Sequence, residues 1–250
     1  MQYLLSRACR TVLSRLADER SLCAFDFDGT LASIVEHPEQ AGMGHQTRIL
    51  LARLAELYPC VIVSGRARAD LLNRLTGVKV ERVIGNHGAE TEAATPRPCL
   101  MAEWKAVMER ELGGLHGVWV EDKGLSLAVH YRQAPQKPQA RRQILAATQK
   151  LDHVHVLGGK LVVNLVADTA PNKGKALAAE RDRLGCNWVL FVGDDENDED
   201  AFALDGNMIP VRIGRKRYSH ARYYLRNQAE INTLLELLVR LRSPVQPSLG

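Results

Sequence analysis

Short apolar runs alternate with amphipathic stretches in the first 90 residues. Continuous apolar runs occur at 22–25 and 60–63, and a less regular one spans 78–84. Between them, 46–57 and 69–75 carry apolar residues at helical spacing. Continuous apolar runs of this length are typical of strands that are covered on both faces. The alternation of strands and helices therefore predicts βαβ units and a parallel sheet.

The pattern changes after Thr95-Pro96-Arg97-Pro98, a sequence that indicates a linker. From there to residue 167, a helix followed by two strands is expected twice. These elements are a helix at 99–112, strands at 118–121 and 125–131, a helix from Pro138 to about Leu151, and strands at 153–157 and 160–166, with turns at Asp122-Lys123-Gly124 and Gly158-Gly159. We predict a cap domain over 95–167, with a small antiparallel sheet and helices on one face.

The parallel-sheet pattern resumes after Pro171. The expected elements are a helix at 173–184, a strand at 188–192, a helix at 198–204, a last short strand at 208–213 and a closing helix at 229–241. Together with the first part of the chain, they predict a three-layer α/β core domain formed by 1–94 and 168–250, into which the cap is inserted.

The first twenty residues place apolar side chains at helical spacing, with four arginines between them. Asp18 and Glu19 argue against a transit peptide, and no continuous apolar segment suggests a secretory signal. We expect this stretch to form an amphipathic helix that packs on the sheet. No segment is long and apolar enough to predict a membrane span.

Composition and charge are those of an ordinary globular protein, with 46% hydrophobic residues, 25% charged residues and a net charge of +4. One basic cluster could suggest nucleic acid, but no binding motif accompanies it, so a solvated surface is favoured. It contains Arg212, Arg215, Lys216, Arg217, His220, Arg222 and Arg226. Five cysteines without a C-x-x-C pair indicate a reducing compartment, and hence the cytoplasm.

Two carboxylates, Asp26 and Asp28, follow the first apolar run, and Gly29 comes directly after them. Ligands of open parallel sheets bind outside the carboxyl ends of the strands, so we expect both carboxylates to face a cleft. Neighbouring carboxylates repel each other, and Mg²⁺ commonly relieves this repulsion. The same spacing also fits an acidic turn without a further role, since Asp and Gly favour turns.

Other polar groups follow later strands or begin helices: Ser64-Gly65-Arg66, Lys173, and an acidic loop with Asp194 and Asp198. Each has a simple structural explanation, as a helix cap, a solvated lysine or an acidic loop whose spacing does not match an EF-hand. As a set they predict phosphoryl transfer. A carboxylate supplies the nucleophile, a metal and a lysine neutralise charge, and a hydroxyl with helix-start amides holds the phosphate oxygens.

The ordered motifs D-x-D-G-T, S-G-R, Lys and G-D-D-x-x-D resemble the haloacid dehalogenase phosphatase superfamily. More narrowly, four segments resemble trehalose-6-phosphate phosphatases: G-N-H-G-A-E at 85–90, E-D-K-G-x-S-L-x-V-H-Y-R at 121–132, N-K-G-K-A-L at 172–177 and G-D-D-E-N-D-E-D-A-F at 193–202. The similarity runs from about Leu22 to Phe202. It implies a Rossmann-like core with an inserted α+β cap, and Mg²⁺-dependent hydrolysis of trehalose 6-phosphate through an aspartyl-phosphate.

The resemblance also implies the role of each acidic residue. Asp26 would attack phosphorus, and Asp28 would protonate the departing sugar oxygen and then deprotonate the hydrolytic water. Mg²⁺ would be held by Asp26, the backbone carbonyl of Asp28 and Asp194. Asp198 would lie behind these ligands or would bind the ion through a water molecule.

Ser64, Gly65 and Lys173 would bind the phosphate oxygens. Lys175 is the competing lysine, but the family pattern places the functional one directly before Gly174. The resemblance further implies that the substrate meets Arg66, Asn86, His87 and Gly88 of the core and Glu121, Lys123 and His130 of the cap. Hinges for cap closure are expected at Pro96 and at Ala167-Asp168-Thr169.

The chain departs from the family pattern in two places. Asn164 and Val166-Ala167 stand where many relatives have a Glu and then an Arg-Pro, so one sugar contact differs. Asn197 replaces a Thr. Other sugar phosphates, such as a glycosyl-phosphoglycerate or sucrose phosphate, are alternative substrates. A non-catalytic sugar-phosphate sensor and a phosphomutase are alternative functions. In each case the expected partner is a small-molecule sugar phosphate, and neither nucleic acid nor a membrane.

Overall fold

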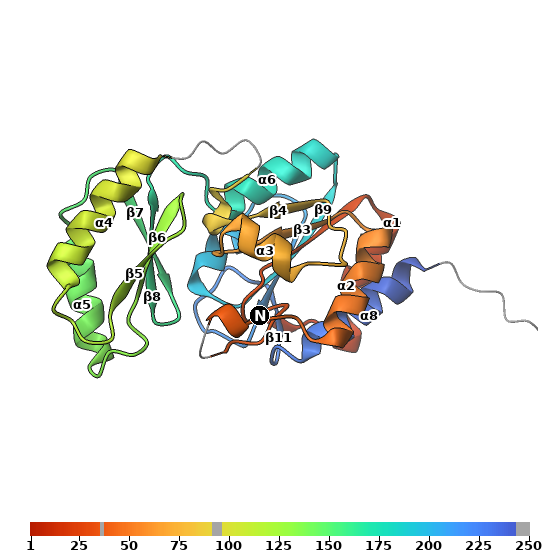
Figure 1. The fold of residues 1–250 in the computed structure, drawn as a ribbon. Coiled ribbons are helices and arrows are strands. Elements are labelled where there is room, and N and C mark those ends of the chain that lie inside the picture. The colour runs from red at the N-terminus through yellow and green to blue at the C-terminus, as the bar shows by residue number, and fades with distance from the viewer. Residues whose placement is uncertain (36–37, 92–96, 244–250) are drawn as a thin grey trace, which may run out of the picture.

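A seven-stranded parallel sheet forms the larger part of the molecule (Figure 1). The computed structural model describes residues 1–35, 38–91 and 97–243. From one edge of the sheet to the other, the strands are β1 (Gln2–Tyr3), β11 (Tyr223–Leu225), β10 (Met208–Ile213), β9 (Trp188–Gly193), β2 (Ser21–Phe25), β3 (Cys60–Val63) and β4 (Arg82–Ile84). Every neighbouring pair is parallel. β2, the first strand predicted from the sequence, therefore lies inside the sheet, between β9 and β3.

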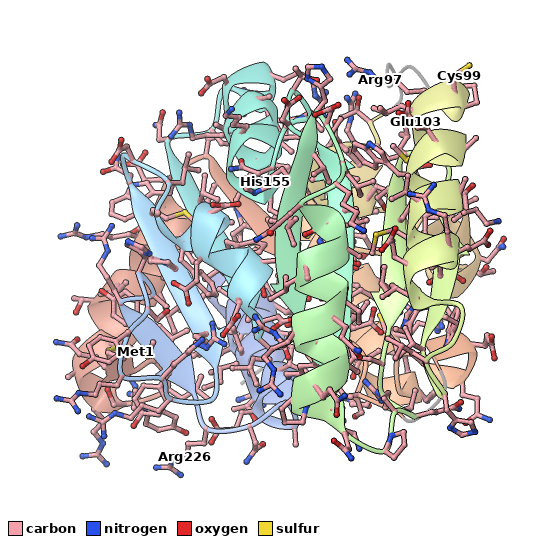
Figure 2. All side chains as sticks on the ribbon, turned by 90° about the vertical axis from the view of Figure 1, so that its left-hand side faces the viewer. Met1, Arg97, Cys99, Glu103, His155 and Arg226 are labelled. Carbon is pink, nitrogen blue, oxygen red and sulfur yellow. The ribbon has the colours of Figure 1, made fainter. Side chains whose placement is uncertain are left out.

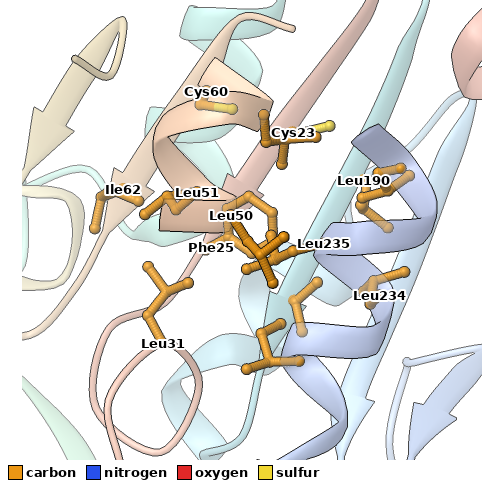
Figure 3. Packing of buried hydrophobic residues seen from close by; sticks show 14 of the residues in the cluster. Cys23, Phe25, Leu31, Leu50, Leu51, Cys60, Ile62, Leu190, Leu234 and Leu235 are labelled. Carbon is orange, nitrogen blue, oxygen red and sulfur yellow. The ribbon is translucent and has the colours of Figure 1, made fainter. Parts of the chain in front are cut away.

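Alternate residues of the central strands face opposite helical layers, as the two-residue period of a strand requires. Cys23 and Phe25 belong to a cluster with apolar residues of α1 (Arg10–Asp18), α2 (His45–Leu57), α3 (Arg68–Arg74) and α8 (Glu230–Arg242). Figure 3 shows Phe25 of this cluster among the leucines of α2 and α8. Leu22 and Ala24 pack instead with α6 (Lys173–Leu184) and α7 (Glu199–Phe202). The predicted three-layer core is confirmed.

The cap is a second, antiparallel sheet covered by two helices. Its strand order is β5 (Trp119–Asp122), β6 (Ser126–His130), β8 (Val162–Ala167) and β7 (Val154–Gly159). Helices α4 (Pro98–Leu112) and α5 (Lys137–Thr148) cover the outer face, and the sheet lies between them and the core (Figure 1). Figure 2, viewed from the cap side, has these helices toward the viewer.

The cap has its own hydrophobic cluster, in which Trp104 and Ile144 of the helices meet Leu127 and Leu165 of the sheet. The twofold αββ order and the fold class are therefore as predicted. The domain limits at 94 and 167 remain predictions. The proposed linker residue Thr95 and the proposed hinge residue Pro96 lie outside the described residues.

The predicted turn at Gly158-Gly159 is wrong. Both glycines belong to β7, and the chain turns at Lys160 and Leu161, whose φ is 63°. The glycines instead allow the cap to lie close to the core. A Cβ on Gly158 would lie 3.2 Å from a carboxylate oxygen of Glu196 in the core. Their lack of a side chain lets the tip of the cap sheet approach the acidic loop.

The N-terminal helix begins later than expected. Residues 2–3 form β1, which pairs with β11, and the amide of Leu4 donates to the carbonyl of Tyr224 at 3.1 Å. Sheet pairing at this edge outweighs the helical pattern of the sequence.

The strand at 78–84 is shortened to β4, and β11 was not predicted because it has only three residues. Short 3-10 helices occur at Arg7–Cys9, Pro38–Gln40, Asn86–Gly88 and Glu196–Asp198.

Candidate active site

Three functional groups meet because their strands are neighbours. β2 lies between β3 and β9, so Asp26, Ser64 and Asp194, each directly after its strand, lie at the same edge of the sheet. The cap covers this edge, and residues of both parts line a cavity of about 420 Å³. Of the predicted site residues, the cavity is lined by Asp26, Asp28, Ser64, Gly65, Arg66, His87, Glu121, Lys123, His130, Lys173 and Asp194. Asn86, Gly88 and Asp198 lie behind its wall.

Lys173, the first residue of α6, is buried between two carboxylates. Its ammonium nitrogen lies 3.0 Å from Oδ1 of Asp26 and 2.6 Å from Oδ1 of Asp198. Burial alone would lower the pKa of Lys173, but the charges of Asp198 and Asp26 outweigh it and raise the pKa, so the lysine stays protonated. Lys175, the competing candidate, is exposed.

Asp198 organises the acidic loop that follows β9. Its Oδ2 accepts hydrogen bonds from the backbone amides of Asp194 at 2.8 Å and Asp195 at 2.9 Å. Arg212 supports the loop from below by donating to the carbonyl oxygens of Asp194 at 2.7 Å and Asp195 at 2.9 Å, and to Glu199 at 2.9 Å. The assignment of Arg212 to a solvated basic surface is therefore wrong, because strand β10 turns this side chain inward, where it is buried.

The carboxylates of Asp26, Asp194 and Asp198 form a group that fits a divalent cation. One oxygen from each lies within 4.8 Å of the others. Burial raises the pKa of Asp194 to about 6 and raises that of Asp26 well above its usual range. Oδ1 of Asp194 is buried and has no hydrogen-bond partner among the described residues. Hard oxygen ligands, buried negative charge and an unpartnered oxygen are what Mg²⁺ would satisfy.

Gly29 shapes the same site. Its φ is 80°, which favours glycine, and an added Cβ would collide with the carboxylate of Asp194. The turn after Asp28 can therefore pass against the acidic group only without a side chain.

Asp28 points toward a guanidinium group. Arg66 donates to both of its carboxylate oxygens, from Nε at 2.6 Å and from Nη2 at 2.8 Å, and Nη1 donates to Asp70 at 2.8 Å. A bidentate pair of this kind fixes the orientation of the carboxylate. Asp70 was not predicted as part of the site, because an acidic residue in the first turn of a helix is common for other reasons.

Asn86 connects the core with the cap. Its Oδ1 accepts from Ser126 of β6 at 2.5 Å, and its amide nitrogen donates to Glu90 at 2.6 Å and to the carbonyl of Lys123 at 3.3 Å. Asn86 and the next residue, His87, have positive φ values of 48° and 60°. Both are buried, and this conformation is uncommon outside glycine.

His87 lines the cavity, and Gly88 packs behind it. Burial and the charges of Lys173 and Lys123 hold the pKa of His87 well below its usual range, so its imidazole is neutral. An added Cβ on Gly65 would collide with the ring of His87, and one on Gly88 with the backbone of Asn172. Both positions therefore require glycine for close packing.

The cap contributes charged groups from β5 and β6 and their neighbours. Lys123 donates to the carbonyl of Gly65 at 3.1 Å, and Nε2 of His130 lies 2.8 Å from Glu121. Burial alone would raise the pKa of Glu121, but the bond to His130 and the charge of Lys123 lower it. Burial also lowers the pKa of Lys123.

Lys160 and Asn164 complete the cap side. Lys160, in the β7–β8 turn, forms an ion pair with Oδ2 of Asp194 in the core. It was not predicted, because the turn was expected two residues earlier. Asn164 is buried in β8 and lines the cavity, so the departure from the family pattern expected at this position lies within the site.

The family model described as trehalose-phosphatase matches residues 24–220. The chain belongs to this family. A trehalose-phosphate phosphatase of Mycobacterium tuberculosis strain H37Rv is 33% identical over 208 residues, which cover 76% of this chain and 52% of that protein. An uncharacterised glycosyl hydrolase of the same strain is 37% identical over 213 residues, which cover 76% of this chain and 16% of that protein. The chain thus spans between 16% and 52% of the length of these two relatives.

Solved structures share the fold of both parts of the molecule. The C-terminal domain of trehalose-6-phosphate phosphatase from Candida albicans has a TM-score of 0.80 at 22% identity and covers 96% of this chain and 98% of its own. A phosphatase of the haloalkanoate (HAD) enzyme superfamily from Bacteroides thetaiotaomicron has a TM-score of 0.65 at 16% identity, covering 91% and 97%. None of the helices in the described residues is both long and apolar enough to cross a membrane.

Proposed function

We propose that this chain is a Mg²⁺-dependent phosphatase that hydrolyses trehalose 6-phosphate to trehalose and phosphate. The observation that carries the proposal is the buried group of Asp26, Lys173 and Asp194 at the sheet edge, under a cap with polar side chains. Membership of the trehalose-phosphatase family supports the same activity.

Asp26 is the nucleophile in this proposal. One of its oxygens forms a bond to phosphorus while the bond from phosphorus to the sugar oxygen breaks, and Asp28 gives its proton to that oxygen. Water then attacks the aspartyl-phosphate, Asp28 takes the proton of the water, and release of phosphate restores Asp26. Arg66 holds Asp28 at the edge of the cavity as a carboxylate, so one oxygen leaves Arg66 when Asp28 carries the proton.

Lys173 and Ser64 bind the phosphate oxygens, and Lys173 also keeps Asp26 in place. Asp26 and Asp194 would hold Mg²⁺ together with the backbone carbonyl of Asp28, while both oxygens of Asp198 already accept hydrogen bonds. Bound there, Mg²⁺ supplies charge neutralisation at the phosphoryl group. The free thiols of all five cysteines suit a cytoplasmic protein, and the proposed partner is a small sugar phosphate.

The test is phosphate release from a panel of esters, measured with and without Mg²⁺. We expect trehalose 6-phosphate to be preferred over glucose 6-phosphate, sucrose phosphate and a glycosyl-phosphoglycerate, and activity to require Mg²⁺. Asp26→Asn should lower turnover by at least about 1,000-fold without loss of structure by circular dichroism. The matched control is Asp205→Asn, an exposed carboxylate that does not line the cavity.

Different results identify the alternatives. A preference for another sugar phosphate would identify that ester as the substrate. Transfer of phosphate to a second sugar hydroxyl instead of water would identify a phosphomutase. Binding of trehalose 6-phosphate without turnover identifies a sensor. Full turnover by Asp26→Asn would overturn the mechanism.

A further inference from the structure

The cap sheet presents one of its faces to the cavity. Leu127 and Val129 of β6 point into the hydrophobic cluster of the cap, so the residues that alternate with them face the other way. On that face, Trp119 of β5 is paired directly with His130 of β6, and Glu121 lies two residues further along β5. Trp119, Glu121 and His130 all line the cavity.

Trp119 is held in place but remains open to the cavity. Its ring stacks on the imidazole of His130, with centroids 4.0 Å apart and planes inclined by 13°. His130 is in turn 2.8 Å from Glu121, which fixes the imidazole. Trp119 is nevertheless 46% exposed, whereas large aromatic side chains are buried for the most part. The indole therefore offers a rigid apolar surface to whatever enters the cavity.

The core contributes another exposed apolar side chain to the same cavity. Ile34, in the loop after Asp28, is 45% exposed and lines the same cavity. Five large hydrophobic residues are exposed in the part of the chain that the structure describes, and Trp119 and Ile34 are the two that line this cavity. Exposed apolar groups that converge in a concave site indicate a ligand surface.

The groups beside Trp119 indicate the chemical class of the ligand. Glu121 accepts hydrogen bonds and Lys123 donates them. Nζ of Lys123 lies 3.9 Å from Oε2 of Glu121, at the end of β5, the strand that carries Trp119. A pyranose ring fits this combination, because its hydroxyls form hydrogen bonds around the ring edge while its C–H face is apolar. A small phosphate ester without a ring would leave the indole uncovered.

We propose that Trp119 is a specificity-determining residue that stacks on the apolar face of a sugar ring in the leaving group. The inference rests on the proposed phosphatase function and names a residue that recognises the leaving group of its substrate. The phosphate lies at Asp26 and Lys173, and the sugar extends toward the cap. His130 acts as a positioning residue, because it supports the indole from the opposite face.

The experiment compares kcat/KM for trehalose 6-phosphate with kcat/KM for glycerol phosphate, which has no ring. In Trp119→Ala we expect the ratio of the two to fall by about 10-fold, mainly through KM for the sugar ester, and Trp119→Phe should restore part of it. Tyr218→Ala is the matched control, since Tyr218 is an exposed aromatic residue that does not line the cavity.

A ratio that stays the same in Trp119→Ala would overturn the inference. If kcat/KM falls equally for both esters, the ratio is unchanged and Trp119 has a structural role only. A nucleoside monophosphate is included in the panel. If its hydrolysis alone depends on Trp119, the indole stacks on a base and the assignment to sugars is wrong.

A second readout separates the inference from the proposed function. Titration with trehalose 6-phosphate should change the tryptophan fluorescence of the parent protein, and Trp119→Phe should remove the change although Trp104 and Trp188 remain. If the parent releases phosphate from no ester but the fluorescence change depends on Trp119, the proposed phosphatase function is wrong and the stacking of Trp119 on a sugar ring is supported. The same fluorescence change in Trp119→Phe would overturn the proposed stacking.

Discussion

Arg66 holds both carboxylate oxygens of Asp28, at 2.6 and 2.8 Å. The residue expected to contact substrate at the cleft rim thus also positions the proposed acid and base. Because a lysine cannot form the bidentate pair, Arg66→Lys should lower kcat for trehalose 6-phosphate by about 10–100-fold while the charge is kept. Steady-state kinetics measures this effect, with Arg53→Lys on the exposed side of α2 as the control. An unchanged kcat would mean that Asp28 needs no such support.

Lys173 should contribute to stability as well as to activity. It is only 2% exposed and pairs with Asp26 and Asp198, so its replacement leaves buried carboxylates without their cation. We expect Lys173→Met to lower the free energy of unfolding by about 3–5 kcal/mol in the absence of Mg²⁺. Urea denaturation gives the value, and Lys175→Met, at the exposed lysine of the same helix, is the control. Equal effects of the two variants would contradict the structural role of the buried cluster.

Mg²⁺ should stabilise the folded protein without any substrate. The ion relieves repulsion between Asp26 and Asp194 and provides a partner for Oδ1 of Asp194. At a concentration 100-fold above its Kd, one bound ion adds about 2.7 kcal/mol, which appears as a rise in Tm. Differential scanning fluorimetry with and without Mg²⁺ measures the shift, and Asp194→Asn should abolish most of it. A shift of the same size in Asp194→Asn would place the ion elsewhere.

Glu121 should make the cap more stable at neutral pH than in acid. The pKa of Glu121 is lowered below its usual 4.5 because the bond to His130 and the charge of Lys123 outweigh burial. A carboxylate with a depressed pKa stabilises the folded state above its unfolded-state pKa, and this contribution is lost as the pH falls through the folded value. The difference in unfolding free energy between the parent and Glu121→Gln should therefore be present at about pH 7 and shrink toward about pH 3.

Denaturation series at several pH values test this dependence. Glu103→Gln is the control, because Glu103 is an exposed glutamate of α4. A difference that grows in acid would show that Glu121 is not stabilised as a carboxylate.

The parallel core was predictable because its signals are local. Apolar runs marked β2, β3 and β9, and the polar residues after them were expected at one edge, where the structure brings Asp26, Ser64 and Asp194 together. Asp28 and Lys173 also lie where the motifs indicated. In these elements the hydrophobic period and the chain order agree with the tertiary structure.

The errors concern residues whose role is decided by distant parts of the chain. Arg212 lies in a basic stretch, but its strand turns it under the acidic loop. Gly158 looked like a turn residue, yet it permits approach to Glu196, 38 positions away in the sequence. Trp119 could not be distinguished from a core aromatic until its pairing with His130 was known. The contact of Gly158 depends on how the cap meets the core, and those of Arg212 depend on how β10 packs beside the acidic loop; no local pattern encodes either.

The hydrophobic cluster of the cap shares no residue with the two clusters of the core. The contacts across the cleft include polar ones, such as Lys123 with Gly65 and Ser126 with Asn86. Substitutions that reshape the cap sheet can therefore accumulate without repacking the strand that carries Asp26. In this architecture, the cap can diverge through its own packing while the packing of the core is retained, and residues that link the two parts, such as Lys123 and Lys160, are constrained by both.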